Sequence, residues 1–149
     1  MNQYKEAAFR RVEAHFGELS DWNQVIWHYG ETALREYKSA AWYVARLKRE
    51  GFEVEPGTGG MPTAFRATWR NGPEDSGGPV IAAYAEYDAV PGNCQAAATK
   101  KMPRAGLSPH AGGHTDPHSA LGISALGGAL AAKGVMQEHG IKGTIVLFG

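Results

Sequence analysis

The chain has 149 residues, and its 15 lysines and arginines balance 15 aspartates and glutamates, which gives a formal net charge of zero. This length suits one domain with a hydrophobic core and is too short for two ordinary domains. The balanced charge lacks the basic excess of a nucleic-acid-binding domain. The single cysteine, Cys94, excludes an internal disulfide, and the polar N-terminus differs from a secretory signal. We therefore expect a soluble, cytoplasmic protein without a membrane-spanning segment.

Two helical regions are predicted in the first third of the chain. Residues 2–19 carry apolar side chains at helical spacing among charged ones, the pattern of an amphipathic surface helix. Ser20 and Asp21 then predict a break and the start of a new helix. This second helical region is expected to extend to about Glu50, with a kink at Gly30.

Two strands are predicted next, at residues 52–55 and 63–70, because apolar and polar side chains alternate in both segments. The connection at residues 56–60 is rich in glycine. A phosphate-binding glycine loop opens directly into a helix, whereas this connection leads into a second strand. We therefore predict no nucleotide site here.

A third strand, at residues 79–87, is the most apolar segment of this part of the chain. Its continuous apolar run is typical of a central strand that is covered on both faces. Glu86 and Asp88 follow at its carboxyl end, where open α/β sheets place their functional sites. The alternative interpretation is that these two carboxylates are solvated charges at a strand end.

The remainder of the chain is predicted as a long loop at residues 90–113, a helix at 118–139 and a buried strand at 143–149. Loops of this length inside a compact domain are often functional. The helix is rich in alanine, glycine and leucine, so we expect it to pack closely against a sheet.

Residues 113–119 place three potential metal ligands, His114, Asp116 and His118, at every second position. In an extended backbone, residues two apart point to the same side. Imidazole and carboxylate groups together suit zinc, manganese and similar divalent ions. Pro117 disfavours helical geometry at Asp116, so a corner before a helix is predicted. The alternative is an ordinary helix start in which Asp116 is the N-cap.

Several motifs in this order and spacing resemble the metal-dependent amidohydrolases and peptidases of the aminobenzoyl-glutamate hydrolase and aminoacylase type. The resemblance covers the chain from about residue 20 onward. The motifs are Glu36-Tyr37-Lys38-Ser39-Ala40, Gly51-Phe52-Glu53-Val54, Pro62-Thr63-Ala64-Phe65, the segment 86–92 and the segment 113–122.

The resemblance implies an α/β catalytic domain with a three-layer mixed sheet, helices on both faces and a site for two divalent metals, zinc or manganese. Residues 1–149 would form the N-terminal portion of this domain, helical at 1–51 and carrying the sheet and metal site at 52–149. The lid and dimerisation domain of the family would lie outside this chain. The implied partners are a small-molecule substrate, the remaining part of the catalytic domain and a second copy in a homo-oligomer, with no nucleic acid and no membrane.

The resemblance also assigns the site residues. The family segment Gly-His-x-Cys-Gly-His supplies a cysteine and a histidine to the metals, and Asp116 and His118 occupy those positions here. His114 is a weaker candidate ligand, and Asp88 matches a catalytic aspartate that orients a neighbouring group. Glu86 stands where other branches have a metal-binding histidine, and we do not count it as a ligand. Asp116 replaces a soft thiolate with a hard carboxylate, which favours manganese or cobalt as well as zinc.

In the relatives, a pair of glutamates that includes the general base follows a strand like 143–149, and the sequence stops before it. We therefore expect this chain to act together with the remaining part of the catalytic domain. The leading hypothesis is a metal-dependent hydrolase of a C–N bond, most simply an amide of a small aryl or acyl amino acid, that uses a metal-activated water. One alternative is hydrolytic deamination of an activated aromatic amine with release of ammonia. Another is an inactive metal-binding fragment that lacks the catalytic glutamate.

Overall fold

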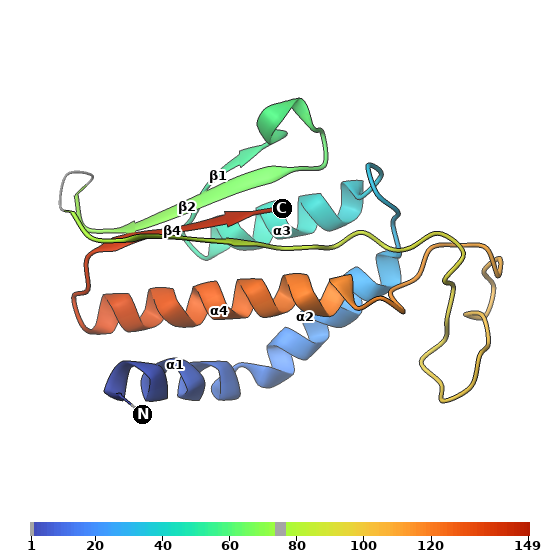
Figure 1. Ribbon diagram of the computed structural model, residues 1–149, viewed down its shortest axis with the longest axis horizontal. Coiled ribbons are helices and arrows are strands. Elements are labelled where there is room, and N and C mark those ends of the chain that lie inside the picture. Colours follow the sequence, from blue (N-terminus) through green and yellow to red (C-terminus); the bar gives the residue numbers. More distant parts are fainter. Residues whose placement is uncertain (1, 74–76) are drawn as a thin grey trace.

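The computed structural model describes residues 2–73 and 77–149. The helices and strands follow one another in a mixed order along the chain (Figure 1). They are α1 (Gln3–Ala14), α2 (Phe16–Tyr29), α3 (Tyr37–Arg49), β1 (Glu53–Pro56), the 3₁₀ turn η1 (Thr58–Gly60), β2 (Phe65–Asn71), β3 (Val80–Tyr84), α4 (His118–Glu138) and β4 (Gly143–Phe148).

The four strands form one mixed sheet in the order β1-β2-β4-β3. β2 pairs antiparallel with both β1 and β4, whereas β3 pairs parallel with β4. The α/β class and the mixed sheet are thus confirmed. The central position predicted for the strand at 79–87 is wrong in the described sheet, because β3 is an edge strand and Val80, Ile81 and Tyr84 are exposed. β4 holds the central position instead.

The layers stack on one side of the sheet. Alternate residues of β2 and β4, among them Phe65, Ala67 and Leu147, are fully buried under α3 and α4. Burial of each large apolar side chain contributes roughly 1.5–3 kcal/mol. α1 and α2 pack on α4, so the third layer lies outside α4 (Figure 1). The opposite face of β2 carries Arg66 and Arg70, which are exposed, and no described helix covers it.

The N-terminal helices break at other residues than predicted. α1 and α2 are separated by His15 alone, and Ser20 and Asp21 lie inside α2. α2 ends at Gly30, whose left-handed backbone (φ 54°) a glycine adopts without strain. A connection at residues 31–36 follows where only a kink was predicted.

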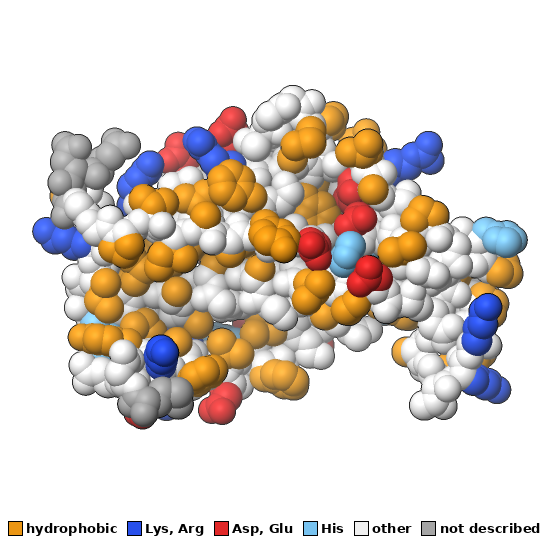
Figure 2. Space-filling model, viewed as in Figure 1, with side chains coloured by type: hydrophobic (Ala, Val, Ile, Leu, Met, Phe, Trp, Pro, Cys, Tyr) orange, Lys and Arg blue, Asp and Glu red, His pale blue; other side chains and the backbone are white. Residues whose placement is uncertain are grey.

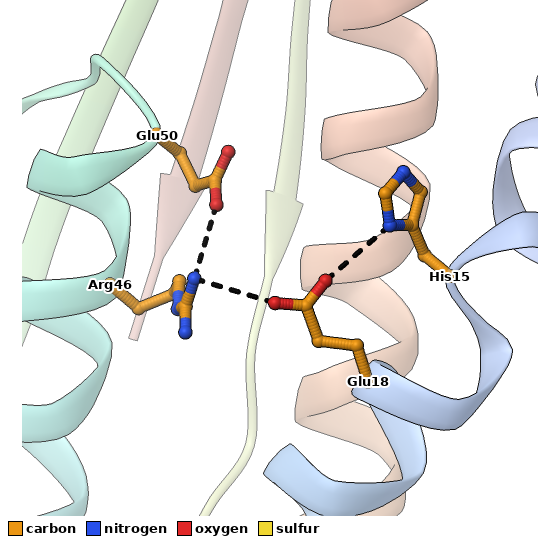
Figure 3. Close-up of polar contacts among 4 residues, drawn as sticks. All are labelled: His15, Glu18, Arg46 and Glu50. Atoms are coloured by element: carbon orange, nitrogen blue, oxygen red, sulfur yellow. Dashed lines mark hydrogen bonds and ion pairs between the residues drawn. The ribbon is translucent and has the colours of Figure 1, made fainter.

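An ion-pair network joins α2 to α3 on the surface (Figure 3). The Arg46 guanidinium lies 3.7 Å from the Glu18 carboxylate and 3.4 Å from that of Glu50, and His15 lies 3.4 Å from Glu18. Arg46 also stacks over the Trp22 ring at 4.2 Å. Partly exposed pairs of this kind contribute about 0–1 kcal/mol each, so the network orients the helices more than it stabilises them.

α4 crosses the molecule beneath the sheet, as the small residues of its sequence predicted (Figure 1). A Cβ atom at Gly122 would overlap the Glu86 carbonyl oxygen and lie 2.5 Å from the Tyr43 hydroxyl, so only glycine allows this approach. By length and composition α4 could also cross a bilayer, but half of its most apolar stretch is buried inside the molecule, as in the core helix of a soluble protein. The close contact at Gly122 places the start of α4 beside residue 86.

Candidate functional site

Three of the predicted site residues, Asp88, Asp116 and His118, meet where the chain after β3, the corner at 113–117 and the start of α4 come together. Val90 and Gly113 exchange two backbone hydrogen bonds of 3.0 and 3.2 Å, which close the loop between them. A Cβ atom at Gly113 would overlap the Asn93 carbonyl, so this position requires glycine. The corner is therefore held against the chain that follows β3. Figure 2 shows acidic side chains gathered around a histidine on this face of the molecule.

Glu86 and Asp88 project to the same side of an extended segment. Ala85, Tyr87 and Ala89 are buried, and the two carboxylates between them are about one-third exposed. This alternation follows from the period of two of an extended backbone. Both carboxylates are directed towards the N-terminus of α4.

His118, the first residue of α4, is held by Asp88. The His118 Nδ1 lies 2.7 Å from the Asp88 Oδ1. Because an ionised carboxylate can only accept a hydrogen bond, Nδ1 carries the proton and its N–H group donates the hydrogen bond to Asp88. In the neutral ring, Nε2 then has a free lone pair, which is the arrangement of metal-binding histidines that a carboxylate orients.

The free nitrogen of His118 faces two more carboxylates. Nε2 lies 3.5 Å from the Glu86 Oε2 and 3.6 Å from the Asp116 Oδ2. Burial lowers the pKa of the His118 imidazole, but the hydrogen bond and charge of Asp88, with the charges of Glu86 and Asp116, outweigh it and raise the pKa above its ordinary value. The same negative charge that favours a proton on Nε2 would favour a metal cation there.

The donor set fits a divalent metal in part. Two ligand atoms bound at about 2.1 Å in tetrahedral geometry are roughly 3.4 Å apart. The spacings of 3.5 and 3.6 Å from Nε2 to the two carboxylates are close to this value. As the side chains lie, however, no group of three or more His, Cys, Asp or Glu residues in the described parts of the chain is arranged so that it could hold a metal ion. The cluster is therefore a partial set of donors.

Asp116 does not act as the helix cap of the alternative interpretation. α4 begins at His118 with Pro117 in the N-cap position and has no side-chain cap hydrogen bond. The Asp116 side chain is 58% exposed and directs its carboxylate towards His118. The predicted proximity of Asp116 and His118 is thus present in the structure.

His114 is not hydrogen-bonded to this cluster in the described parts of the chain. The residue is 8% exposed, and neither ring nitrogen has a hydrogen-bond partner among the described residues. Burial, and then the charge of His118, lower the pKa of the His114 imidazole. The backbone of Ile26 is near enough to oppose this decrease in the pKa, but it forms no hydrogen bond with either ring nitrogen of His114. None of the described hydrogen bonds or ion pairs joins His114 to Asp116 or His118.

Two carboxylates near the cluster were not among the predicted site residues. Glu86 was set aside, although its position in the motif, where related branches have a histidine ligand, could have indicated a role. Glu36 was noted only as part of a motif, and it is buried in a pocket that Glu86 and Asp88 also line. Nothing in the local sequence around Glu36 indicated that it would be buried.

The chain is similar in sequence to a known hydrolase subunit and in fold to two solved structures. No family model matches the chain. It is 33% identical over 138 residues to a p-aminobenzoyl-glutamate hydrolase subunit of Escherichia coli (strain K12), a match that covers 93% of this chain and 27% of the relative.

Two solved structures share the fold. One is that of an aminohydrolase candidate from methicillin-resistant Staphylococcus aureus, with a TM-score of 0.69 at 18% identity over 99% of this chain and 34% of that one. The other is the Bacillus subtilis YXEP protein, a dinuclear metal-binding peptidase of the M20 family, with a TM-score of 0.66 at 19% identity over 91% of this chain and 35% of that one. The chain thus spans about a third or less of the length of these proteins. The sequence match supports the predicted resemblance to the amidohydrolase and peptidase superfamily of the aminobenzoyl-glutamate hydrolase and aminoacylase type, and the two solved structures support the fold.

Proposed function

We propose that this chain is part of a metal-dependent hydrolase that cleaves a C–N bond, most simply an amide of a small aryl or acyl amino acid. The observation that carries the proposal is the His118 imidazole, which Asp88 orients through Nδ1 while Nε2 faces the carboxylates of Asp116 and Glu86. The name of the relative, a hydrolase of p-aminobenzoyl-glutamate, supports an amide substrate.

Each side chain of the cluster has its own role in the proposed site. His118 and Asp116 would hold a divalent metal, zinc or manganese, with Glu86 as a further donor beside them. Bound there, the metal supplies Lewis acidity that activates water near neutral pH. Asp88 is a positioning residue, because it fixes the tautomer of His118 and keeps Nε2 free of a proton in the neutral ring. His114 remains a weaker candidate ligand.

In a protein as long as these relatives, another part of the catalytic domain would supply the remaining metal donors and the general base. A second metal would bind between the two parts. The cytoplasmic location and the homo-oligomer remain predictions of the same proposal.

Hydrolytic deamination of an activated aromatic amine is the second candidate. The structural similarity to an aminohydrolase candidate favours it, because that name describes the removal of an amino group. Both reactions would use the same activated water, and they differ in the carbon that is attacked and in the group that leaves.

Product analysis of the full-length protein distinguishes the two reactions. The natural protein, loaded with zinc or manganese, is incubated with p-aminobenzoyl-glutamate and, separately, with an aromatic amine that carries an electron-withdrawing substituent. Release of glutamate supports amide hydrolysis. Release of ammonia together with a phenol would instead support deamination. Turnover of neither substrate class, or full activity after removal of the metal by a chelator, would contradict the proposal.

A further inference from the structure

A small pocket lies beside the candidate site and shares two of its carboxylates. Its volume is about 220 Å³, and Glu36, Glu86 and Asp88 line it. Much of the remaining wall is apolar and includes Leu34, Met61 and Ala64. Pockets for drug-sized ligands measure roughly 300–1,000 Å³, so this pocket suits one substituent of a larger molecule.

Glu36 is an unpaired carboxylate in the wall of this pocket. Its side chain belongs to a residue that is only 7% exposed, and its Oε2 is buried without a hydrogen-bond partner among the described residues. Burial of an ionised carboxylate is costly unless a cation or hydrogen-bond donor faces it. A partner from outside the described chain would remove this cost.

Glu36 is not needed to cap the helix at which it lies. It occupies the N-cap position of α3 but makes no side-chain cap hydrogen bond. Glu31 takes that role, since its carboxylate accepts hydrogen bonds from the backbone N–H groups of Lys38 at 3.0 Å and Ser39 at 2.9 Å. The neighbouring glutamate thus has a complete set of structural partners, and Glu36 does not.

The hydroxyl group of Tyr87 in the pocket wall does not satisfy Glu36. It donates a hydrogen bond of 2.5 Å to the Thr63 carbonyl. After burial, the negative charges of Glu36 and Asp88 both raise the pKa of Tyr87, as expected for two carboxylates that line the same pocket. The pocket therefore combines negative charge with apolar walls, a combination that complements an organic cation.

We propose that Glu36 is the recognition residue for a protonated aliphatic amine, carried by a substrate whose scissile bond reaches His118. The ammonium group would donate to the Glu36 carboxylate, and its alkyl stem would lie against Leu34 and Met61. This inference rests on the proposed hydrolase function and adds to its substrates small amides that carry a second, cationic nitrogen.

Binding of two small probes to the full-length protein tests this inference without any hydrolysis. The protein is freed of metal with a chelator, and ligand-observed NMR compares n-butylammonium chloride with n-butanol at pH 7. Saturable binding of n-butylammonium at least about tenfold tighter than that of n-butanol is expected, because one charge-assisted hydrogen bond accounts for a factor of this size. Glu36→Gln should remove this preference. Glu53→Gln, which changes an exposed glutamate on β1, should leave it unchanged.

A second variant keeps the test decisive if Glu36→Gln does not fold. Leu34 is 74% exposed at the edge of the pocket, so Leu34→Lys should preserve the fold and place an ammonium group over Glu36. This variant should lose n-butylammonium binding. Equal binding of the two probes, or n-butylammonium binding unchanged in folded Glu36→Gln or Leu34→Lys protein, would overturn the inference. Because metal and turnover are absent from the assay, its outcome is separate from that of the product analysis.

Discussion

Tyr43 and Tyr87 contact each other in the core with ring centroids 5.1 Å apart and the rings tilted by 31°, but their hydroxyl groups have different environments. The Tyr87 hydroxyl donates to the Thr63 carbonyl, whereas the Tyr43 hydroxyl is buried without a partner among the described residues. Tyr87→Phe should lower the free energy of unfolding by about 1–3 kcal/mol, because it leaves a buried carbonyl unpaired. Tyr43→Phe should be neutral or stabilising by about 1 kcal/mol, since it removes an unpaired hydroxyl. Urea denaturation of both variants measures this difference, and equal losses of stability would contradict it.

The same two residues predict how stability depends on pH. Burial, and then the proximity of Tyr87, raise the pKa of Tyr43; burial, Glu36 and Asp88 raise that of Tyr87. A raised pKa in the folded state leaves stability unaffected below the unfolded value of about 10 and reduces it as the pH rises further. Absorbance titration should therefore show fewer than all six tyrosines ionising in the native protein, with the rest ionising on unfolding. Ionisation of all six while the fold persists would refute this prediction.

The local sequence predicted part of the site at this scale. The proximity of Asp116 and His118 follows from their spacing and from Pro117, because those features restrict the local backbone. Glu86 and Asp88 were candidates because they follow an apolar strand, whereas the role of Asp88 came from the family resemblance. The roles of Glu86 and Glu36 depend on contacts that residues far apart in the sequence make, so neither could be derived from the local pattern.

Two glycines of α4 have different surroundings, and only one of them is required for close packing. Gly122→Ala should destabilise the protein by about 1–3 kcal/mol, because the new methyl group would overlap the Glu86 carbonyl and displace α4 from the site. Gly128→Ala is the matched control, since nothing lies within 4 Å of its added methyl group. It should stabilise the helix by about 0.5–1 kcal/mol. Thermal unfolding of both variants tests the pair, and a tolerated Gly122→Ala would show that α4 does not pack this closely.

The existence of every long element was predictable, but the arrangement of the strands was not. Periodicity located β1, β2, β4 and α4 to within one or two residues. The apolar run of β3 predicted a strand with neighbours on both sides, and the described sheet provides only β4. An apolar run indicates that a strand is covered in the folded protein, but it does not identify the segments that cover it, which can lie elsewhere in the sequence.

At the scale of the whole molecule, β3 exposes an apolar edge. Val80 is 69% exposed, Ile81 52% and Tyr84 69%, and unpaired edges of this kind pair with other chains. The 149-residue chain alone should therefore self-associate. Ile81→Lys should reduce the association seen by light scattering, whereas Phe9→Lys on α1, which also replaces an exposed apolar residue, should not. A monodisperse unmodified chain would contradict this expectation.

The central claim is that residues of this chain supply metal donors to a hydrolase site. Its most direct test is the metal content of the purified full-length protein, measured by mass spectrometry for the wild type and for Asp116→Ala and His118→Ala. His110→Ala, in the exposed loop, is the control. We predict that the wild type and the control retain the same divalent metal content and that both site variants lose at least part of it. Unchanged metal content in both site variants would contradict the assignment.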